Sequence, residues 1–172
     1  MSFRSFIKLQ ANIQNLIQPG NWLKFNFLMH SEECEWIFQK SIDRDRAKEF
    51  IIEAGKNMSD FSLRSIQEDV ILFDYYTPRG QWMDQVRIEV IAGDPCKASL
   101  LAKSTGVVPL IVPFAPLLST ILFWVPFQDY GGKTSQEIAL LQREFMAISN
   151  TSVESRTTRY SLGNPRRPDK GK

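Results

Sequence analysis

A β-hairpin is predicted by residues 70–92, which read VILFDYYTPRGQWMDQVRIEVIA. Residues 70–76 are rich in apolar and aromatic side chains, as strands are. In residues 83–92 apolar side chains alternate with charged ones, which is the period of a half-buried strand. Residues 77–80 suit the turn between them, because proline fixes φ and glycine accepts a positive φ.

Further strands and helices are predicted on both sides of this hairpin. Strands are expected at residues 22–29, 34–39, 61–66 and 97–103, and helices at 3–17, from about 44 to 54, and from 134 to 148. Strands joined by short turns pair antiparallel, and helices cover a sheet face. We therefore expect one α+β domain over residues 1–148, an antiparallel β-sheet with helices packed on one face, in the order α-β-β-α-β-β-β-β-α.

Helix ends are indicated by residues with capping preferences. Ser41 or Asp43 can cap the second helix, and Gly55 suits the left-handed position just after its end. Thr134 and Glu137 have the spacing of a capping box, in which each side chain bonds the other residue's amide. The third helix is therefore expected to start with Thr134 as its N-cap.

An apolar, proline-rich insert precedes the last helix. Residues 107–127 read VVPLIVPFAPLLSTILFWVPF, 21 uncharged residues of which 15 are hydrophobic. Prolines at 109, 113, 116 and 126 leave only residues 117–125 free of proline, about 13 Å of helix. That length cannot cross a hydrocarbon layer of about 30 Å. A single membrane-spanning helix is therefore not expected here.

Three roles remain open for the insert. It can fill the core as a buried loop or short helix, dip into one leaflet of a membrane with its aromatic rings at the interface, or bind a protein partner. The rest of the chain already has an apolar face on each predicted element, so spare core volume is not obvious. The residues expected to contact a membrane or partner are Phe114, Leu118, Phe123, Trp124 and Phe127.

Charged residues flank the insert. If it folds back as a hairpin, Lys103 and Asp129 approach each other and can close the loop with a salt bridge or turn cap. Lys133 precedes the last helix, whose N-terminal amides and dipole favour anions such as a lipid headgroup phosphate. Both the Lys103–Asp129 pair and Lys133 can also be explained as residues with a purely structural role.

The C-terminal residues 149–172 form a basic tail. They carry six basic and two acidic residues and few apolar ones, although the whole chain has a net charge of only +2. Such a segment buries too little surface to offset its ordering entropy, so we expect it to be disordered. Near an anionic leaflet, each of its basic residues would add to binding.

Compartment and chemistry are constrained mainly by what the sequence lacks. It has no apolar signal-peptide core at its N-terminus, and Cys34 and Cys96 are best explained as thiols of a reducing cytoplasm. His30 is the only histidine, and the Gly131-Gly132-Lys133 stretch lacks the first glycine of a P-loop. No catalytic motif is therefore apparent, and we expect no metal or cofactor. The net charge of +2 also gives no indication of a nucleic acid partner.

Part of the sequence resembles the DUF1499 family of uncharacterised domains. The resemblance covers about the C-terminal half of the chain and is carried by residues 69–73, 102–106 and 129–131 and the helix from Thr134. This sequence departs from the family pattern by placing the apolar insert between the two motif halves. The resemblance implies a topology and no chemistry.

Three functional hypotheses follow. The first is a non-enzymatic domain of the cytoplasm that associates peripherally with membranes or lipid through residues 107–127. The second is a protein-interaction module that uses the same surface. The third is an enzyme or a carrier of a small apolar ligand, with a pocket between the sheet and the C-terminal helix under the insert.

Overall fold

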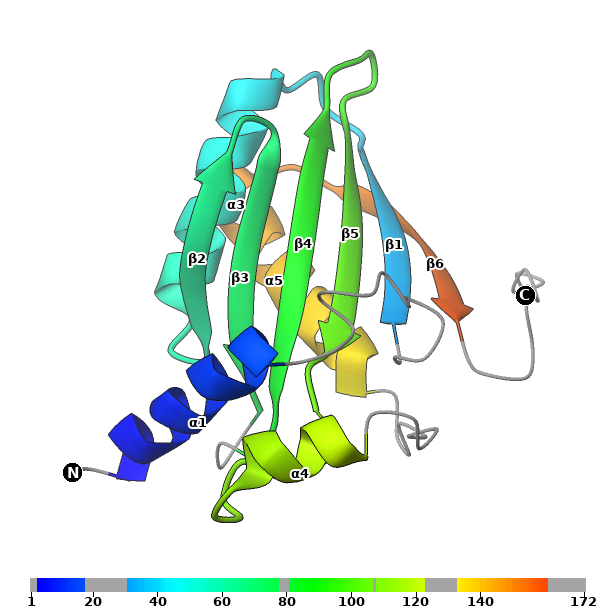
Figure 1. The fold of residues 1–172 in the computed structure, drawn as a ribbon. Helices are drawn as coiled ribbons and strands as arrows, with labels where there is room; N and C mark the ends of the chain where they lie inside the picture. The colour runs from blue at the N-terminus through cyan, green and yellow to red at the C-terminus, as the bar shows by residue number, and fades with distance from the viewer. Residues whose placement is uncertain (1–2, 18–30, 78–80, 107, 123–132, 161–172) are drawn as a thin grey trace.

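The computed structural model describes residues 3–17, 31–77, 81–106, 108–122 and 133–160. They form an antiparallel sheet with helices, so the predicted α+β class is confirmed (Figure 1). The strands are β1 (Ser31–Phe38), β2 (Phe61–Gln67), β3 (Val70–Tyr76), β4 (Met83–Ile91), β5 (Lys97–Ser104) and β6 (Val153–Tyr160). The helices are α1 (Phe3–Ile17), α3 (Arg44–Asn57), α4 (Ala115–Ile121) and α5 (Lys133–Ser149).

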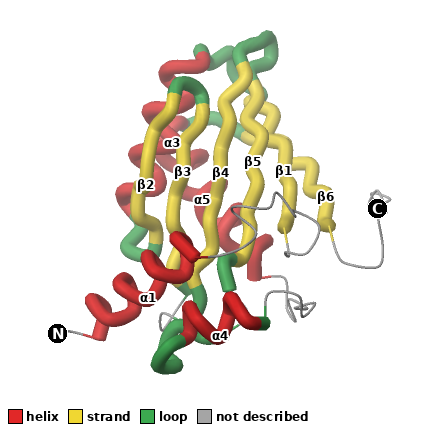
Figure 2. Tube along the Cα trace, viewed as in Figure 1, coloured by secondary structure: helices red, strands yellow, loops and turns green. Residues whose placement is uncertain are grey.

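The six strands lie in the order β2-β3-β4-β5-β1-β6, and every neighbouring pair is antiparallel. The predicted hairpin is the β3–β4 pair, in which Phe73 lies opposite Val86. Helices α3 and α5 lie behind the sheet, whereas α1 and α4 lie at its lower end (Figure 2). The expectation that all helices pack on one face therefore holds for α3 and α5 only.

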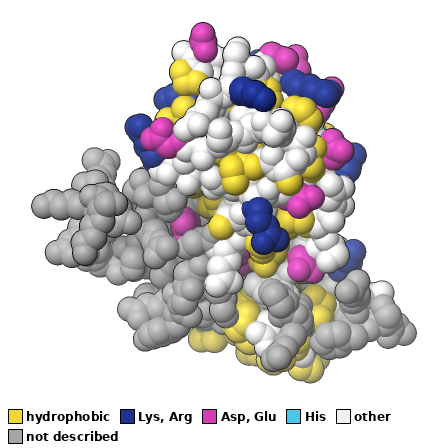
Figure 3. Space-filling model, turned by 180° about the vertical axis from the view of Figure 1, so that it is seen from behind, with side chains coloured by type: hydrophobic (Ala, Val, Ile, Leu, Met, Phe, Trp, Pro, Cys, Tyr) yellow, Lys and Arg dark blue, Asp and Glu magenta, His cyan; other side chains and the backbone are white. Residues whose placement is uncertain are grey.

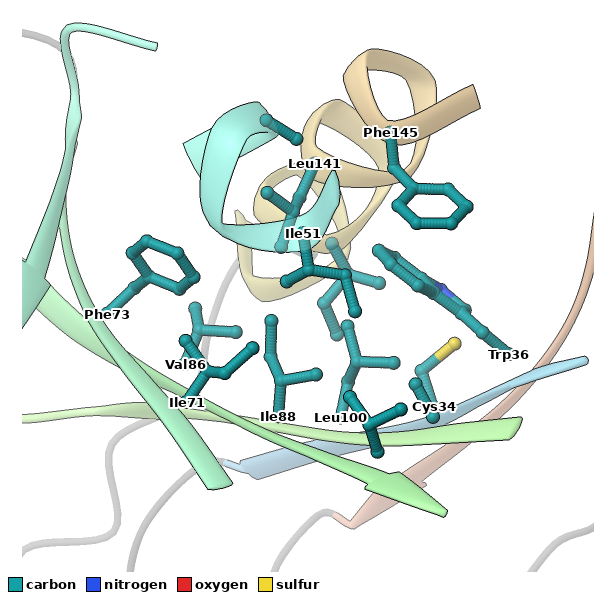
Figure 4. Close-up of a cluster of buried hydrophobic side chains, with 14 of the residues drawn as sticks. Cys34, Trp36, Ile51, Ile71, Phe73, Val86, Ile88, Leu100, Leu141 and Phe145 are labelled. Atoms are coloured by element: carbon teal, nitrogen blue, oxygen red, sulfur yellow. The ribbon is translucent and has the colours of Figure 1, made fainter. Parts of the chain in front are cut away.

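The main core lies between the sheet and the helices α3 and α5 (Figure 4). Trp36 and Phe38 of β1 and Phe145 of α5 are fully buried, with ring centroids 5.1 Å apart for Phe38–Phe145 and 5.9 Å for Trp36–Phe145. Alternating strand residues such as Val86 and Ile88 complete the cluster from β4. The period-two pattern of the sequence therefore marks the side chains of the core.

Gly55 was wrongly predicted to end the second helix. The helix α3 continues to Asn57, and Gly55 is buried within it. A Cβ atom at Gly55 would lie 2.4 Å from Cε1 of Phe73. This glycine therefore permits close packing of helix on sheet and not a left-handed turn. The other end was predicted correctly, since the Asp43 side chain accepts a hydrogen bond of 2.9 Å from the Arg46 amide.

The predicted start of the last helix is displaced by one residue, and the hydrogen bonds of the predicted capping box stay a prediction. The helix α5 begins at Lys133, one residue before the threonine that the motif required as N-cap. Glu137 is completely buried. Its side chain is therefore part of the interior and not of an exposed helix end.

The predicted disorder of residues 149–172 is wrong for the first part of that segment. Residues 153–160 form β6, which pairs along its whole length with β1, from Phe38↔Val153 to Ser31↔Tyr160. The strand β6 lies at the edge of the sheet, where charged side chains are common because they discourage pairing with another chain. Residues 161–172 and the predicted strand at 22–29 lie outside the described residues.

A second, smaller apolar cluster holds α1 and α4 at the lower end of the sheet. Its buried members are Ile7 and Ala11 of α1, Met83 of β4 and Leu110. Met83 alternates with the core-facing residues of β4, so it points to the other side of the sheet from α3 and α5. The apolar insert therefore packs away from the main core.

Candidate functional site

The apolar insert folds into turns followed by the short helix α4. Pro109 and Val112 accept backbone hydrogen bonds in these turns, and Pro116 stands in the first turn of α4, where a missing N–H costs nothing. Phe114 is the N-cap and has φ 63° and ψ 18°, a left-handed conformation that costs a side chain other than glycine about 1 kcal/mol. The prolines thus set the path of the chain.

The helix α4 presents its small residues to the protein and its large residues to the outside. Its buried residues are Ala115, Pro116 and Ser119. Leu117 is 57% exposed, and the neighbouring Phe114 is 76% exposed. A surface helix normally buries its large apolar side chains. The faces of α4 are therefore reversed relative to an ordinary amphipathic helix.

Helix α1 adds a second exposed apolar stripe beside α4. We define the apolar end surface as the exposed large hydrophobic residues of α1, α4 and the turn before α4: Leu9, Ile13, Leu16, Ile111, Phe114, Leu117, Leu118 and Ile121. In the described ranges, the other exposed residues of this kind are Ile66, Ile91 and Leu140. Seen from behind, hydrophobic side chains gather at the lower end, and most of the charged ones lie above it (Figure 3).

The structure places some of the predicted contact residues on this surface. Phe114 and Leu118 are both exposed. Phe123, Trp124 and Phe127 lie outside the described residues. The insert is thus divided, with Leu110 fully buried and the outer side of α4 exposed.

The predicted ionic groups are not brought together among the described residues. Lys103 lies near the end of β5, where burial, and to a smaller extent the Arg64 guanidinium, lowers the pKa of its ammonium group. Asp129 is outside the described residues, so the predicted Lys103–Asp129 contact stays a prediction. Lys133 is the first residue of α5, and the proposed headgroup contact there also stays a prediction.

One buried polar group was missed from the sequence. Tyr75 of β3 lies opposite Asp84 of β4, and both are buried. Burial, and then the charges of Glu137, Asp60 and Asp84, raise the pKa of Tyr75 to about 12. Asp84 stands at a position of β4 whose side chain faces the core, as those of Val86 and Ile88 do. An acidic residue at such a position was the sequence signal that could have revealed this buried polar group. Burial and these three carboxylates together favour the protonated form of the Tyr75 phenol.

A second buried carboxylate lies on the opposite side of the sheet. Asp74 of β3 pairs with Arg64 across the β2–β3 register shift, at 3.1 Å from Oδ1 to Nη1. Burial raises the pKa of the Asp74 carboxyl, while Arg64 and a hydrogen bond from Gln85 act in the opposite direction. This arrangement is an ion pair within the sheet.

Two findings concern metal sites and membrane-spanning helices in the described residues. In the described part of the chain, no three His, Cys, Asp or Glu residues are grouped as metal ligands. None of the helices described is both long enough and apolar enough to cross a membrane. The apolar end surface is therefore the most unusual feature of these residues.

No protein family model matches the chain, and no curated protein matches it either. The resemblance to the DUF1499 family stays a prediction.

Proposed function

We propose that this protein associates peripherally with membranes and inserts the outer side of α4 into the interface of one leaflet. The observation that supports this most is the reversed orientation of α4, with Ala115 and Ser119 buried and Phe114 and Leu117 exposed. Large apolar surfaces on a protein mark contacts with membranes, partners or ligands. A helix at the interface buries such a face against the acyl chains.

The energetic gain from such an insertion is substantial. Burying a Leu or Phe side chain completely stabilises by about 1.5–3 kcal/mol. Phe114 and Leu117 have more than half of that surface still in water. Each would therefore contribute about 1–2 kcal/mol on entering an apolar phase. The left-handed conformation of Phe114 is consistent with a role in contact, since strained residues concentrate at functional sites.

The chemistry of the exposed side chains favours lipid over protein. Protein interfaces are enriched in Tyr, Trp and Arg and carry about one hydrogen bond per 100–200 Å². The outer side of residues 111–121 instead presents aliphatic side chains and one phenylalanine, and residues 104–128 contain no charged residue. A fluid hydrocarbon phase needs neither hydrogen bonds nor shape complementarity, so this composition suits it.

The cytoplasm remains the proposed compartment. Cys34 and Cys96 are both buried, and no disulfide joins them in the structure. Buried thiols are what a reducing compartment allows. The membrane contact would then be with a leaflet that faces the cytoplasm.

Flotation with lipid vesicles tests the proposal. The variant Phe114→Asp/Leu117→Asp should bind vesicles about a hundredfold more weakly than the wild type, because it loses two apolar contacts and adds two charges. The matched control is Ile66→Asp/Ile91→Asp, which alters two residues that are 49% and 46% exposed and lie on the sheet. The control should float like the wild type.

Two outcomes would contradict the proposal. One is a wild type that does not float with vesicles of any composition tested. The other is equal flotation of the wild type and the Phe114→Asp/Leu117→Asp variant. In either case, a protein partner captured by the same surface becomes the better explanation.

A further inference from the structure

Helix α1 has two apolar stripes, and only one of them is used inside the protein. Ile7 and Ala11 are buried against Met83 and Leu110. The second stripe consists of Leu9, Ile13 and Leu16, which are spaced four and three residues apart and are exposed. Because residues at this spacing share one helix face, α1 offers a continuous apolar strip to the outside.

Two buried glutamines attach α1 to the chain around α4. The Gln10 Nε2 atom donates hydrogen bonds to the carbonyl oxygens of Leu110 and Val112, at 2.5 and 3.0 Å. The Gln14 Nε2 atom donates to Oγ1 of Thr105, at 3.1 Å. Only 5% of Gln10 and 2% of Gln14 are exposed. These contacts join residues about 100 positions apart, at both ends of the turn region that leads into α4.

Gly106 lies directly against the end of the Gln14 side chain. A Cβ atom at Gly106 would lie 2.1 Å from Nε2 of Gln14. Thr105 Oγ1, which accepts from Gln14, itself donates to the carbonyl oxygen of Met83 at 2.5 Å. Gln14, Gly106 and Thr105 thus connect α1 to β4 and to the start of the insert.

We infer that α1 and α4 bind the membrane as one unit, that Gln10 and Gln14 are its positioning residues, and that the preferred partner is a bilayer surface rich in anionic phospholipid. The inference rests on the proposed function and extends it to α1. Helix α1 contains Arg4 and Lys8 and no acidic residue, and the first acid of the chain is Glu32.

Lys8 is exposed on the same helix as the outer apolar stripe. Basic residues at the edge of an inserted apolar face are attracted to the negative surface potential of an anionic leaflet. The insert itself is uncharged, so α1 supplies the charge that would select the lipid.

Fluorescent labels on the two helices test the inference in the full chain. Leu9→Cys and Leu117→Cys each place an environment-sensitive fluorophore on one helix, and the native cysteines are buried and react slowly. On titration with vesicles of phosphatidylcholine and phosphatidylserine, both labels should shift to the blue at the same half-saturating lipid concentration. Pure phosphatidylcholine should require about tenfold more lipid. A label at Ile91→Cys should not respond.

The labels separate failure of the inference from failure of the proposed function. If the label at 117 responds and the label at 9 does not, the proposed function stands and the joint surface is refuted. If both respond equally with neutral and anionic vesicles, the preference for anionic lipid is refuted. If neither responds to any vesicle, both proposals fail.

The role of the glutamines is tested with variants of similar side-chain volume. Gln10→Met/Gln14→Met removes the donors, so the labels at 9 and 117 should now half-saturate at lipid concentrations that differ by about tenfold. A general loss of stability would move both labels together. Unchanged and equal half-saturation in this variant would show that the glutamines do not position α1 for binding.

Discussion

The main core and the apolar end surface contain the same types of residue, but the side chains are buried in the core and exposed at the end surface. Between the sheet and α5, the aromatic rings of Phe38 and Phe145 stack 5.1 Å apart and are fully buried. On α4, Phe114 is exposed and the small Ala115 is buried. The difference teaches that apolar content alone does not define a core. What decides is whether another element of the fold covers the side chain.

The largest expected effect comes from removing one phenylalanine from each region. Phe145→Ala should lower the free energy of unfolding by about 3–5 kcal/mol, because it leaves a cavity in the main core. Phe114→Ala should change it by less than about 0.5 kcal/mol, because most of that ring is in water. Urea unfolding of both variants measures the contrast. Similar losses would show that Phe114 is covered by protein.

A smaller effect is expected where helix and sheet approach most closely. Gly55→Ala gains about 1 kcal/mol of helix propensity, but its Cβ would overlap the Phe73 ring. Overpacking of this kind costs about 1–3 kcal/mol, so we expect a net loss of stability. Gly55→Ala/Phe73→Leu should recover part of it. A Gly55→Ala variant as stable as wild type in urea would show that the Phe73 ring moves aside freely.

The raised pKa of the buried Tyr75 predicts that the stability of the main core depends on pH. The pKa of Tyr75 is raised to about 12, so between pH 10 and 12 the folded state holds a proton that the unfolded state releases. This contribution to stability is present below about pH 10 and is lost as the pH rises toward 12. The urea midpoint should therefore fall with pH in this window, and fall less steeply in Tyr75→Phe. Equal slopes would contradict the assignment.

The smallest expected effect separates stability from membrane binding at a single position. Phe114 has a positive φ that glycine adopts without strain, so Phe114→Gly should raise the stability by at most about 1 kcal/mol or leave it unchanged. The same variant should bind vesicles about tenfold more weakly. Thermal unfolding and flotation of one preparation test both statements. A clear loss of stability would show that the ring packs on the protein.

Most of the sheet could be predicted from the sequence, because its strands alternate and lie beside clear turns. The strand β6 could not, since Glu154 and Arg156 are ordinary in a solvated tail and become strand residues only by pairing with β1. Gly55 could not be assigned either, because its role depends on Phe73, a residue of another element.

Only part of the apolar end surface could be predicted from the sequence. The prolines excluded a spanning helix, and Phe114 and Leu118 were expected at a contact surface. The contribution of α1 was not expected, because Gln10 and Gln14 have no visible role until the fold brings them to Thr105 and Leu110. Polar residues on the buried face of a helix depend on a distant partner, which the helical period does not reveal.

The central claim is that the outer side of α4 enters the hydrocarbon region of a membrane. Quenching of a fluorophore at Phe114→Cys by lipids brominated on their acyl chains measures this directly. We predict strong quenching at position 114 and none at the control Ile91→Cys, whose side chain lies on the sheet. Equal quenching at the two positions, or none at position 114 while the protein is bound to vesicles, would contradict it.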